Sequence, residues 1–429
     1  MAKERKYWNE ELETMSLDDL RKLQEKRLQE TVSRAYEKTK FYRQKFDDAG
    51  IKPSGINTLD DLQKLPLIHS SEDFRKAPIP DRLAVPFEEV KYLESSSGTT
   101  GVPMAILWSG KDWKNLMDAE ARARWTLGTR PSDVVHVLTG FPCCQGGYQH
   151  LGAMVMALSA GRGVLDNQIK LGQMVGVSVL EYLPSLVLKY FERAIEMGYD
   201  IKNGSIRLIS ALGEGWAEAY KRRVEDEYNV TLRTLYGSVD AGLIGAQCES
   251  GEGLHTFLDL VITEIIDPET GEVLTPGQEG ELVITLLWPD ATPIIRYRTG
   301  DVTKILPYEP CPCGRTHPRI SMVRGRAVQI TKVKGKNILP IDVEEIVADI
   351  PELESDYQIL VDKPGELEVL KVKMEYKPDV KDRKALKKRV EDAFKKNLSV
   401  ESDVELVPMG TLGREKFKAT RVIRTYDEN

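Results

Sequence analysis

The spacing of apolar side chains predicts an α/β fold over the middle of the chain. Between about residues 130 and 300, apolar runs typical of β-strands, such as DVVHVLTG, RLISALG and ELVITLLW, alternate with stretches of helical periodicity, such as PSLVLKYFERAIEMG and AEAYKRRVEDEY. This alternation favours a sheet that is largely parallel and covered by helices. Nearer the start, apolar positions at roughly helical spacing predict one helix over residues 16–46, and Ser16 with Asp19 forms a capping-box pattern at its beginning.

The pattern changes after Gly325 and predicts a second, smaller domain. Short β-like runs, YQILVD, ELEVLKVKMEYK and DVELVP, surround a predicted helix over residues 382–398. That helix carries one apolar stripe at i, i+4 spacing, which consists of Leu386, Val390, Phe394 and Leu398. We therefore predict a large α/β domain over residues 1–325 and a compact α+β domain over residues 326–429, with a hinge near residues 325–332.

Composition and charge narrow the classes of function. The chain has 429 residues and a formal net charge of −7, which argues against a general affinity for nucleic acid. No apolar stretch approaches the roughly 18 residues that a membrane helix requires, and the charged start MAKERKYWNEELE does not resemble a secretory signal. We therefore predict a cytoplasmic protein with no membrane partner. Five cysteines, an odd number, argue against a disulfide framework and leave metal binding or inert burial open.

The segment SSSGTTG, residues 95–101, has the composition of a phosphate-binding loop. Glycines allow backbone N–H groups to approach a ligand, and hydroxyl side chains donate hydrogen bonds without adding charge, so a polyphosphate is a suitable ligand. Apolar β-forming stretches at residues 92–93 and 104–108 favour a loop within a hairpin, whereas a flexible linker is the alternative. The segment lacks the Gly-Lys-Ser/Thr ending of the common nucleotide loop. Composition alone leaves both interpretations open.

Six motifs together resemble those of the adenylate-forming enzymes, and most closely those of the phenylacetate–CoA ligase branch. In chain order they are SSSGTTG, ALGEGW, YGSVDAG, RYRTGD, GRAVQITKVKGKNILPIDVEE and GREKFKATR. Each motif is weak by itself, but all six in the same order between residues 36 and 421 form a specific signature. The resemblance implies a large α/β domain of mixed and parallel sheets with a β subdomain, a small mobile α+β domain, and ATP-dependent activation of a carboxylic acid.

The resemblance also implies how ATP would be held. The residues expected to wrap the β- and γ-phosphates are Ser96, Ser97, Gly98, Thr99, Thr100 and Gly101. Gly213 and Glu214 would border the adenine, and Tyr236, followed by Gly237, would stack on it. The carboxylate of Asp301 would accept hydrogen bonds from both ribose hydroxyls. Without the family context, Tyr236 would be an ordinary core aromatic and Asp301 a turn residue.

The same resemblance implies roles for several basic residues of the small domain. Arg326 would reach the ribose or the phosphates from the hinge. The loop expected to meet the pantetheine arm of coenzyme A consists of Lys334, Gly335 and Lys336. Lys418 falls where the family carries its adenylation lysine, although Lys416 lies two residues away and is the rival. The alternative for all of these side chains is a solvated basic surface.

The sequence departs from the family pattern near the tyrosine motif. The family usually continues this motif with Ser or Thr and then a Glu that helps to place Mg²⁺, whereas Val239 and Asp240 occupy these positions here. Asp240 is still a hard oxygen ligand for Mg²⁺ but reaches one methylene less, and Val239 cannot donate to a phosphate. His69 and Ser70 stand where a lysine is usual. These differences bear on rate and substrate more than on ATP binding.

Two turn-rich stretches, QCESGEGLH and CPCGRTHPR, contain candidate metal ligands, namely Cys248, His255, Cys311 and Cys313. Three thiolates and an imidazole suit tetrahedral Zn²⁺, and four protein ligands would make the site structural. The Cys-x-Cys spacing is tighter than in the usual zinc finger, and His317 is a spare candidate ligand. Unpaired thiols in loops are the alternative.

The stretch GFPCCQGGYQHLGAMVMALSAG, residues 140–161, lies where the family lines its acid-binding pocket. Its glycines would let a flat ring approach the backbone, and Phe141 and Tyr148 would offer faces for packing. The alternative is a buried helix with its preceding turn. Cys143 and Cys144 have no evident base partner in the sequence, so we do not expect nucleophilic catalysis there.

These observations predict a ligase that uses ATP, Mg²⁺ and coenzyme A. It would convert an aryl or arylacetic acid, such as phenylacetate, to acyl-AMP and then to acyl-CoA, with release of pyrophosphate and AMP. One alternative is an adenylating enzyme with another acceptor, such as a cofactor or a carrier protein. A second is a nucleotide-binding homologue that has lost catalysis, which Val239 and Asp240 would permit. The expected partners are small molecules, and the sequence leaves open whether two copies of the chain form a homodimer.

Overall fold

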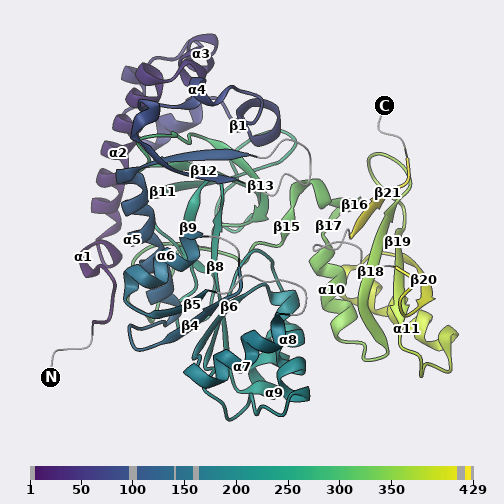
Figure 1. Cartoon of the computed structure of the whole chain (residues 1–429). Helices are drawn as coiled ribbons and strands as arrows, with labels where there is room; N and C mark the ends of the chain where they lie inside the picture. Colours follow the sequence, from purple (N-terminus) through teal and green to yellow (C-terminus); the bar gives the residue numbers. More distant parts are fainter. Residues whose placement is uncertain (1–4, 96–103, 140–141, 158–163, 413–420, 427–429) are drawn as a thin grey trace. The chain divides into compact units, whose positions relative to one another are not determined.

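The structure, a computed structural model, describes residues 5–95, 104–139, 142–157, 164–412 and 421–426 (Figure 1). The chain forms two compact units. One consists of Met1–Glu214 with Glu227–Val323, and the other of Gly215–Asp226 with Arg324–Asn429. Within the described ranges, no helix is long and apolar enough to cross a membrane.

The larger sheet of the first unit has the strand order β14-β10-β9-β8-β7-β6-β4-β5. Its parallel part consists of β8 (Thr231–Ser238), β7 (Leu208–Ala211), β6 (Val179–Tyr182), β4 (Val134–Val137) and β5 (Met154–Ala157). The antiparallel part consists of β9 (Gly242–Ala246), β10 (Leu254–Thr256) and β14 (Arg319–Ile320). Helices alternate with the parallel strands along the chain, namely α6 (Pro142–Leu151), α7 (Leu165–Val175), α8 (Pro184–Glu196) and α9 (Glu218–Tyr228), and most of α9 belongs to the second unit. The predicted α/β fold is confirmed.

A second sheet and a separate hairpin complete the strands of this unit. The sheet contains β1 (Ile68–His69), β13 (Tyr297–Thr303), β12 (Gly280–Leu286) and β11 (Val261–Ile266), in that spatial order. β1 is parallel to β13, and the other pairs are antiparallel. The hairpin joins β2 (Val90–Ser95) to β3 (Ala105–Ser109), with Ser95 paired to Ala105. The prediction that SSSGTTG belongs to a hairpin is therefore confirmed, whereas the conformation of residues 96–103 lies outside the described ranges.

The N-terminal helices correct one prediction. Instead of one helix over residues 16–46, the chain forms α2 (Leu17–Lys38) and α3 (Lys40–Asp48), preceded by α1 (Glu10–Glu13). Thr39 separates them because its backbone is extended, with φ −114° and ψ 139°, and its side chain accepts a hydrogen bond from the Tyr42 N–H. A threonine in this conformation is a good N-cap, so it ends one helix and starts the next. Ser16 is the N-cap of α2, as its position in the sequence predicts. Short helical segments follow at η1 (Pro53–Gly55), η2 (Leu59–Lys64), η3 (Ser70–Phe74), α4 (Ile79–Arg82) and η4 (Phe87–Glu89).

Helix α5 (Gly110–Leu127) is the buried element against which α6 packs. Two glycines allow this close approach. A Cβ atom at Gly146 would lie 2.3 Å from the Met117 Sδ, and one at Gly147 would lie 2.5 Å from the Glu120 Cβ. Both distances are shorter than van der Waals contact permits. The Gly-Gly pair of the glycine-rich stretch thus has a packing role between these helices.

The second unit is built on a four-stranded sheet with the order β20-β19-β18-β21. Its strands are β20 (Ser402–Pro408), β19 (Leu370–Tyr376), β18 (Leu353–Val361) and β21 (Val422–Arg424). The predicted helix over residues 382–398 is confirmed as α11 (Arg383–Leu398), which buries Leu386, Val390 and Phe394. The remaining elements are β15 (Gly325–Arg326), η5 (Ala327–Gln329), β16 (Thr331–Val333), β17 (Lys336–Ile338) and α10 (Pro340–Ala348).

Candidate functional site

Two of the sequence motifs meet through a hydrogen bond between Tyr236 and Asp301. Tyr236 lies on β8 and Asp301 on β13, and the tyrosine hydroxyl donates to the Asp301 Oδ2 over 2.7 Å. Asp301 is 7% exposed, whereas Tyr236 is half-buried. The hydroxyl holds one carboxylate oxygen in place. A carboxylate oriented in this way can still accept hydrogen bonds from paired hydroxyl groups of a ligand.

A second aspartate–tyrosine pair connects the same two motifs, but here the tyrosine belongs to RYRTGD and the aspartate to YGSVDAG. Tyr297 on β13 donates to the Oδ2 of Asp240, which follows β8, over 2.7 Å. Burial raises the pKa of Tyr297, so its phenol stays protonated and acts as the donor. Tyr297 belongs to the RYRTGD motif but is not among the site residues predicted from the sequence. The two crossed pairs fix YGSVDAG and RYRTGD relative to each other.

Backbone geometry accounts for two glycines that were expected to contact ATP, Gly237 of YGSVDAG and Gly213 of ALGEGW. A Cβ atom at Gly237 would lie 2.5 Å from the Gly242 carbonyl oxygen, so only glycine fits between the strands there. Gly213 has φ +78°, a conformation that other residues rarely adopt. Beside it, the Glu214 Oε2 accepts a hydrogen bond from the Ser185 N–H over 3.1 Å, in the first turn of α8. The adenine contacts expected of Gly213 and Glu214 remain predictions.

Several predicted residues lie outside the described ranges. They are Ser96, Ser97, Gly98, Thr99, Thr100 and Gly101 of the phosphate loop, Phe141, Lys418 and its rival Lys416. The described strands β2 and β3 fix the two ends of the phosphate loop, at Ser95 and beyond residue 103. The roles of these residues therefore remain predictions from the sequence.

The second unit carries its expected ligand-binding residues at exposed positions in a turn and on two short strands. Lys334 and Gly335 connect β16 to β17 and have φ angles of +46° and +79°. The Lys336 Nζ donates to the Leu398 carbonyl oxygen over 2.8 Å. Arg326 is exposed, and its backbone N–H donates to the Gln329 Oε1 over 2.9 Å. These positions are accessible to a ligand within this unit, and their contacts with ATP and coenzyme A remain predictions.

The expected acid-binding stretch is described over residues 142–157, where buried and exposed positions are mixed. Tyr148 on α6 is fully buried, and the Arg124 guanidinium lies 4.4 Å from its ring centroid. One face of that ring is therefore covered by a cation, and the contact of Tyr148 with an acid remains a prediction. A hydrogen bond with Cys144 and burial both raise the pKa of Cys143. A protonated thiol is a poor nucleophile, which agrees with the expectation that this pair takes no covalent part in the reaction.

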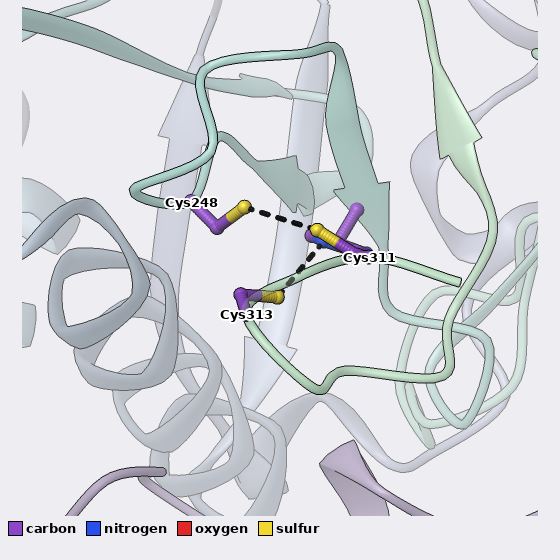
Figure 2. Close-up of side chains that lie close together, drawn as sticks. Cys248, Cys311 and Cys313 are labelled. Carbon is purple, nitrogen blue, oxygen red and sulfur yellow. Dashed lines mark hydrogen bonds between the residues drawn. The ribbon is translucent and has the colours of Figure 1, made fainter. Parts of the chain in front are cut away.

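The four predicted metal ligands converge in one buried cluster. Figure 2 labels its three cysteines, Cys248, Cys311 and Cys313. The ligand atoms of Cys248, His255, Cys311 and Cys313 all lie within 4.8 Å of one another. The Cys248 and Cys311 sulfurs are 3.6 Å apart, and the Cys313 sulfur is 3.4 Å from the His255 Nε2. Zn–S bonds of about 2.3 Å and Zn–N bonds of about 2.0 Å give edges of roughly 3.5–3.8 Å in a tetrahedron. These separations therefore suit one tetrahedral metal ion.

Hydrogen bonds from neighbouring groups orient the side chains of this cluster. The His255 Nδ1 bonds to the His317 carbonyl oxygen over 2.7 Å, which leaves Nε2 as the lone-pair donor toward the sulfurs. A hydrogen bond from Cys313 lowers the pKa of the Cys248 thiol and outweighs the effect of burial. His317 is not a ligand, because its Nδ1 accepts from the Leu258 N–H over 3.0 Å and its Nε2 donates to the Leu12 carbonyl oxygen over 2.7 Å.

The loop that follows Cys313 also holds the N-terminal segment. Tyr7 donates to the Cys313 carbonyl oxygen over 3.1 Å, and the Arg315 Nε donates to the Glu13 Oε2 over 2.7 Å. Thr316 adds a hydrogen bond from its hydroxyl to the Met15 carbonyl oxygen over 2.6 Å. Glu13 and Arg315 are both buried, so this ion pair is shielded from solvent. The cluster and the first helix therefore form one connected structure.

Comparisons with known proteins agree with the six motifs. Residues 335–425 match the family model described as the AMP-binding enzyme C-terminal domain. The chain is 33% identical over 440 residues to a phenylacetate-coenzyme A ligase of Thermus thermophilus, with 96% of this chain and 98% of that protein covered. It is 32% identical over 426 residues to a phenylacetate-coenzyme A ligase of Escherichia coli, with 96% of each protein covered. A solved structure of 2-hydroxyisobutyryl-CoA ligase in complex with R3-HIB-AMP aligns with a TM-score of 0.89 and 26% identity, covering 99% of this chain and 93% of that one. The chain belongs to the phenylacetate–CoA ligase family of adenylate-forming, AMP-producing CoA ligases.

Proposed function

We propose that the chain activates an aryl or arylacetic acid, with phenylacetate as the first acid to test. The crossed pairs Tyr236–Asp301 and Tyr297–Asp240 are the observation that carries this proposal. They fix the positions of Asp301, which we propose accepts hydrogen bonds from the ribose, and of Asp240, which we propose contributes oxygen atoms to Mg²⁺. The substrate class is supported by the names of the bacterial relatives, which are phenylacetate-coenzyme A ligases.

The proposed chemistry begins with a carboxylate that a thiol cannot attack, because it is anionic and would have to expel oxide. Its oxygen attacks the α-phosphorus of ATP, and pyrophosphate leaves as the P–O bond breaks. The acyl-AMP then reacts with the thiol of coenzyme A, and AMP leaves. Mg²⁺, when bound, would neutralise phosphate charge during the first step.

Residues of this chain would divide these tasks. Asp301 would orient the ribose and Tyr236 the adenine, Asp240 would provide oxygen atoms to Mg²⁺, and Lys418 would stabilise charge between the acid and the α-phosphate. The loop at Lys334 would meet the pantetheine arm in the second step. The phosphate loop would enclose the two outer phosphates, because its hydroxyl and backbone donors suit oxygen anions.

A panel of carboxylic acids tests this proposal. Purified protein is assayed for acid-dependent pyrophosphate release, with and without coenzyme A, and for AMP and acyl-CoA formation. We expect arylacetic and aryl acids to give the highest rates, with acyl-CoA formed only when coenzyme A is present. Pyrophosphate release without any acyl-CoA would point to another acceptor. No pyrophosphate exchange with any acid would leave the impaired homologue as the remaining interpretation.

The substitution Asp301→Ala should weaken ATP binding far more than acid binding. It removes the acceptor for two ribose hydroxyls and leaves the Tyr236 hydroxyl without its partner at 2.7 Å. We expect a loss of about 1–3 kcal/mol in ATP binding, the range for hydrogen bonds to a charged group. Isothermal titration calorimetry measures this, with Tyr236→Phe as the matched control that keeps the carboxylate. Unchanged ATP affinity would mean that Asp301 is only a structural residue of β13.

We also propose that Cys248, His255, Cys311 and Cys313 bind one structural Zn²⁺. Four protein ligands fill a tetrahedral site, so no position is open for catalysis. The fixed His255 tautomer and the distances between ligand atoms support this donor set. Elemental analysis of protein purified without added metal should find about one zinc per chain. A metal-free protein with normal stability would contradict the proposal.

A homodimer and a cytoplasmic location remain predictions. Light scattering coupled to size-exclusion chromatography distinguishes the 48.4 kDa monomer from a dimer. A single species at the monomer mass would reject the homodimer.

A further inference from the structure

Arg82, the last residue of α4, is a buried cation without a carboxylate partner. It is 4% exposed, and no described carboxylate lies within 4.0 Å of its guanidinium. Its Nη1 makes only long contacts, 3.4 Å to the Ala105 carbonyl oxygen and 3.7 Å to the Met104 sulfur. Its Nε has no hydrogen-bond partner among the described residues. Burial lowers the pKa of Arg82, but an arginine side chain still remains protonated.

The other buried arginines of the described chain are paired, which sets Arg82 apart. The five in question and their carboxylate partners are Arg122 with Asp259, Arg124 with Glu181, Arg296 with Glu264, Arg315 with Glu13, and Arg319 with Glu252. Their nitrogen–oxygen distances run from 2.7 to 3.3 Å. A buried charge without a partner is unfavourable for the folded state. Proteins tolerate such costly features at functional sites.

The surroundings of Arg82 lie beside the proposed nucleotide site. The guanidinium carbon is 4.5 Å from the centroid of Phe74, whose ring in turn packs edge-on against Tyr297 at 5.8 Å. Tyr297 donates to the Asp240 Oδ2 over 2.7 Å, which connects the surroundings of Arg82 to that carboxylate. Ala105 opens β3, the strand that leaves the phosphate-loop hairpin.

We infer that Arg82 binds the pyrophosphate portion of ATP, next to Asp240 and the beginning of β3. The inference rests on the proposed function. A phosphate suits this position better than the carboxylate of the acid substrate, because Asp240 would repel a bare carboxylate. A nucleotide phosphate arrives with Mg²⁺, to which Asp240 can contribute, so that both the arginine and the aspartate are satisfied. Arg82 would also favour departure of pyrophosphate by pairing with the charge that develops on it.

The test compares Arg82→Met, which keeps the length of the side chain, with Arg82→Lys, which keeps the charge. Calorimetry measures binding of ATP, inorganic pyrophosphate and AMP in the presence of Mg²⁺. We expect Arg82→Met to weaken ATP and pyrophosphate about 10- to 100-fold, the loss expected for a charge-assisted hydrogen bond. AMP lacks the two outer phosphates, so its affinity should change less than about threefold. Arg82→Lys should fall between the wild type and Arg82→Met.

Thermal unfolding without ligand distinguishes this binding role from a structural one. Because Arg82→Met removes an unpaired buried charge, its unfolding midpoint should equal or exceed that of the wild type. Either a lower midpoint or an equal loss of AMP binding would show that Arg82 is structural, and a loss confined to acid binding would show that it pairs with the substrate carboxylate. Each of these outcomes overturns the inference and leaves the proposed function intact. A wild type that fails to catalyse ATP–pyrophosphate exchange would overturn both.

Discussion

Replacing Lys418 by alanine is expected to slow formation of the acyl-adenylate by roughly 100- to 1000-fold, the range seen when one preorganised electrostatic group is lost. The first half-reaction brings a carboxylate and a triphosphate together, and an ammonium between them offsets their repulsion. Thioester formation from a supplied acyl-adenylate should remain nearly normal, because that step is expected to use the loop at Lys334 instead. Single-turnover measurements of each half-reaction, with acyl-adenylate supplied for the second, separate the two effects.

Lys416 provides the matched control for Lys418, since it is the same residue type two positions away. Lys416→Ala should leave both half-reactions close to the wild-type rates. If Lys416→Ala instead abolishes adenylation and Lys418→Ala does not, the roles of the two lysines are reversed. An equal loss in both half-reactions for Lys418→Ala would indicate a folding defect or a solvated structural residue.

The double substitution Cys311→Ser with Cys313→Ser should remove the metal and destabilise the first unit. Two of the four ligands are lost, and the Arg315 loop that follows them holds Glu13 at 2.7 Å. Structural zinc contributes on the order of 10 kcal/mol to small zinc domains, and a part of that amount should be lost here because the remaining core persists. We expect the thermal midpoint to fall by more than about 5 °C, with zinc content below about 0.2 per chain.

The two remaining cysteines give a control for this experiment. Cys143 and Cys144 lie on α6, apart from the metal cluster, so Cys143→Ser with Cys144→Ser should retain the zinc. Full zinc content in the Cys311 and Cys313 variant, or equal loss in both double variants, would contradict a site built from Cys248, His255, Cys311 and Cys313. Recovery of the midpoint on adding zinc to chelated wild-type protein would confirm that the metal is the cause.

Helices and strands with a clear apolar periodicity could be predicted from the sequence. Helix α11 carries its apolar stripe at every fourth residue, so the helix could be identified. The stretches between residues 130 and 300 alternate between strand-like and helix-like periodicity, so the α/β pattern could also be identified. The convergence of the four candidate metal ligands was predictable for a chemical reason, because cysteine and histidine are scarce in this chain and four of them occur in two short loops. The break at Thr39 was missed because an apolar pattern continues through it, and only the backbone conformation reveals the cap.

Pairings between distant residues account for what could not be predicted. Tyr297 and Asp240 are 57 positions apart, and nothing near either residue specifies the other. Arg82 occurs in the sequence PDRLA, and this local sequence predicts an exposed arginine. Its burial follows from Phe74 and from β3, which reach it from different parts of the chain. Such contacts depend on the assembled fold rather than on local propensity.

The cluster of Cys248, His255, Cys311 and Cys313 joins segments that the ribosome makes at different times. Cys248 is made 63 residues before Cys311, and Glu13 is made 302 residues before Arg315. Cys248 and His255 therefore cannot meet their partners until Cys311 and Cys313 have been synthesised. Helix α1 is made even earlier than Cys248 and cannot pair with the loop at Arg315 until that loop has emerged. Because domains fold as units once their last segment emerges, completion of the first unit should coincide with emergence of this loop. Nascent chains that end before residue 311 should leave α1 open to proteolysis, whereas chains that extend past β14 should protect it.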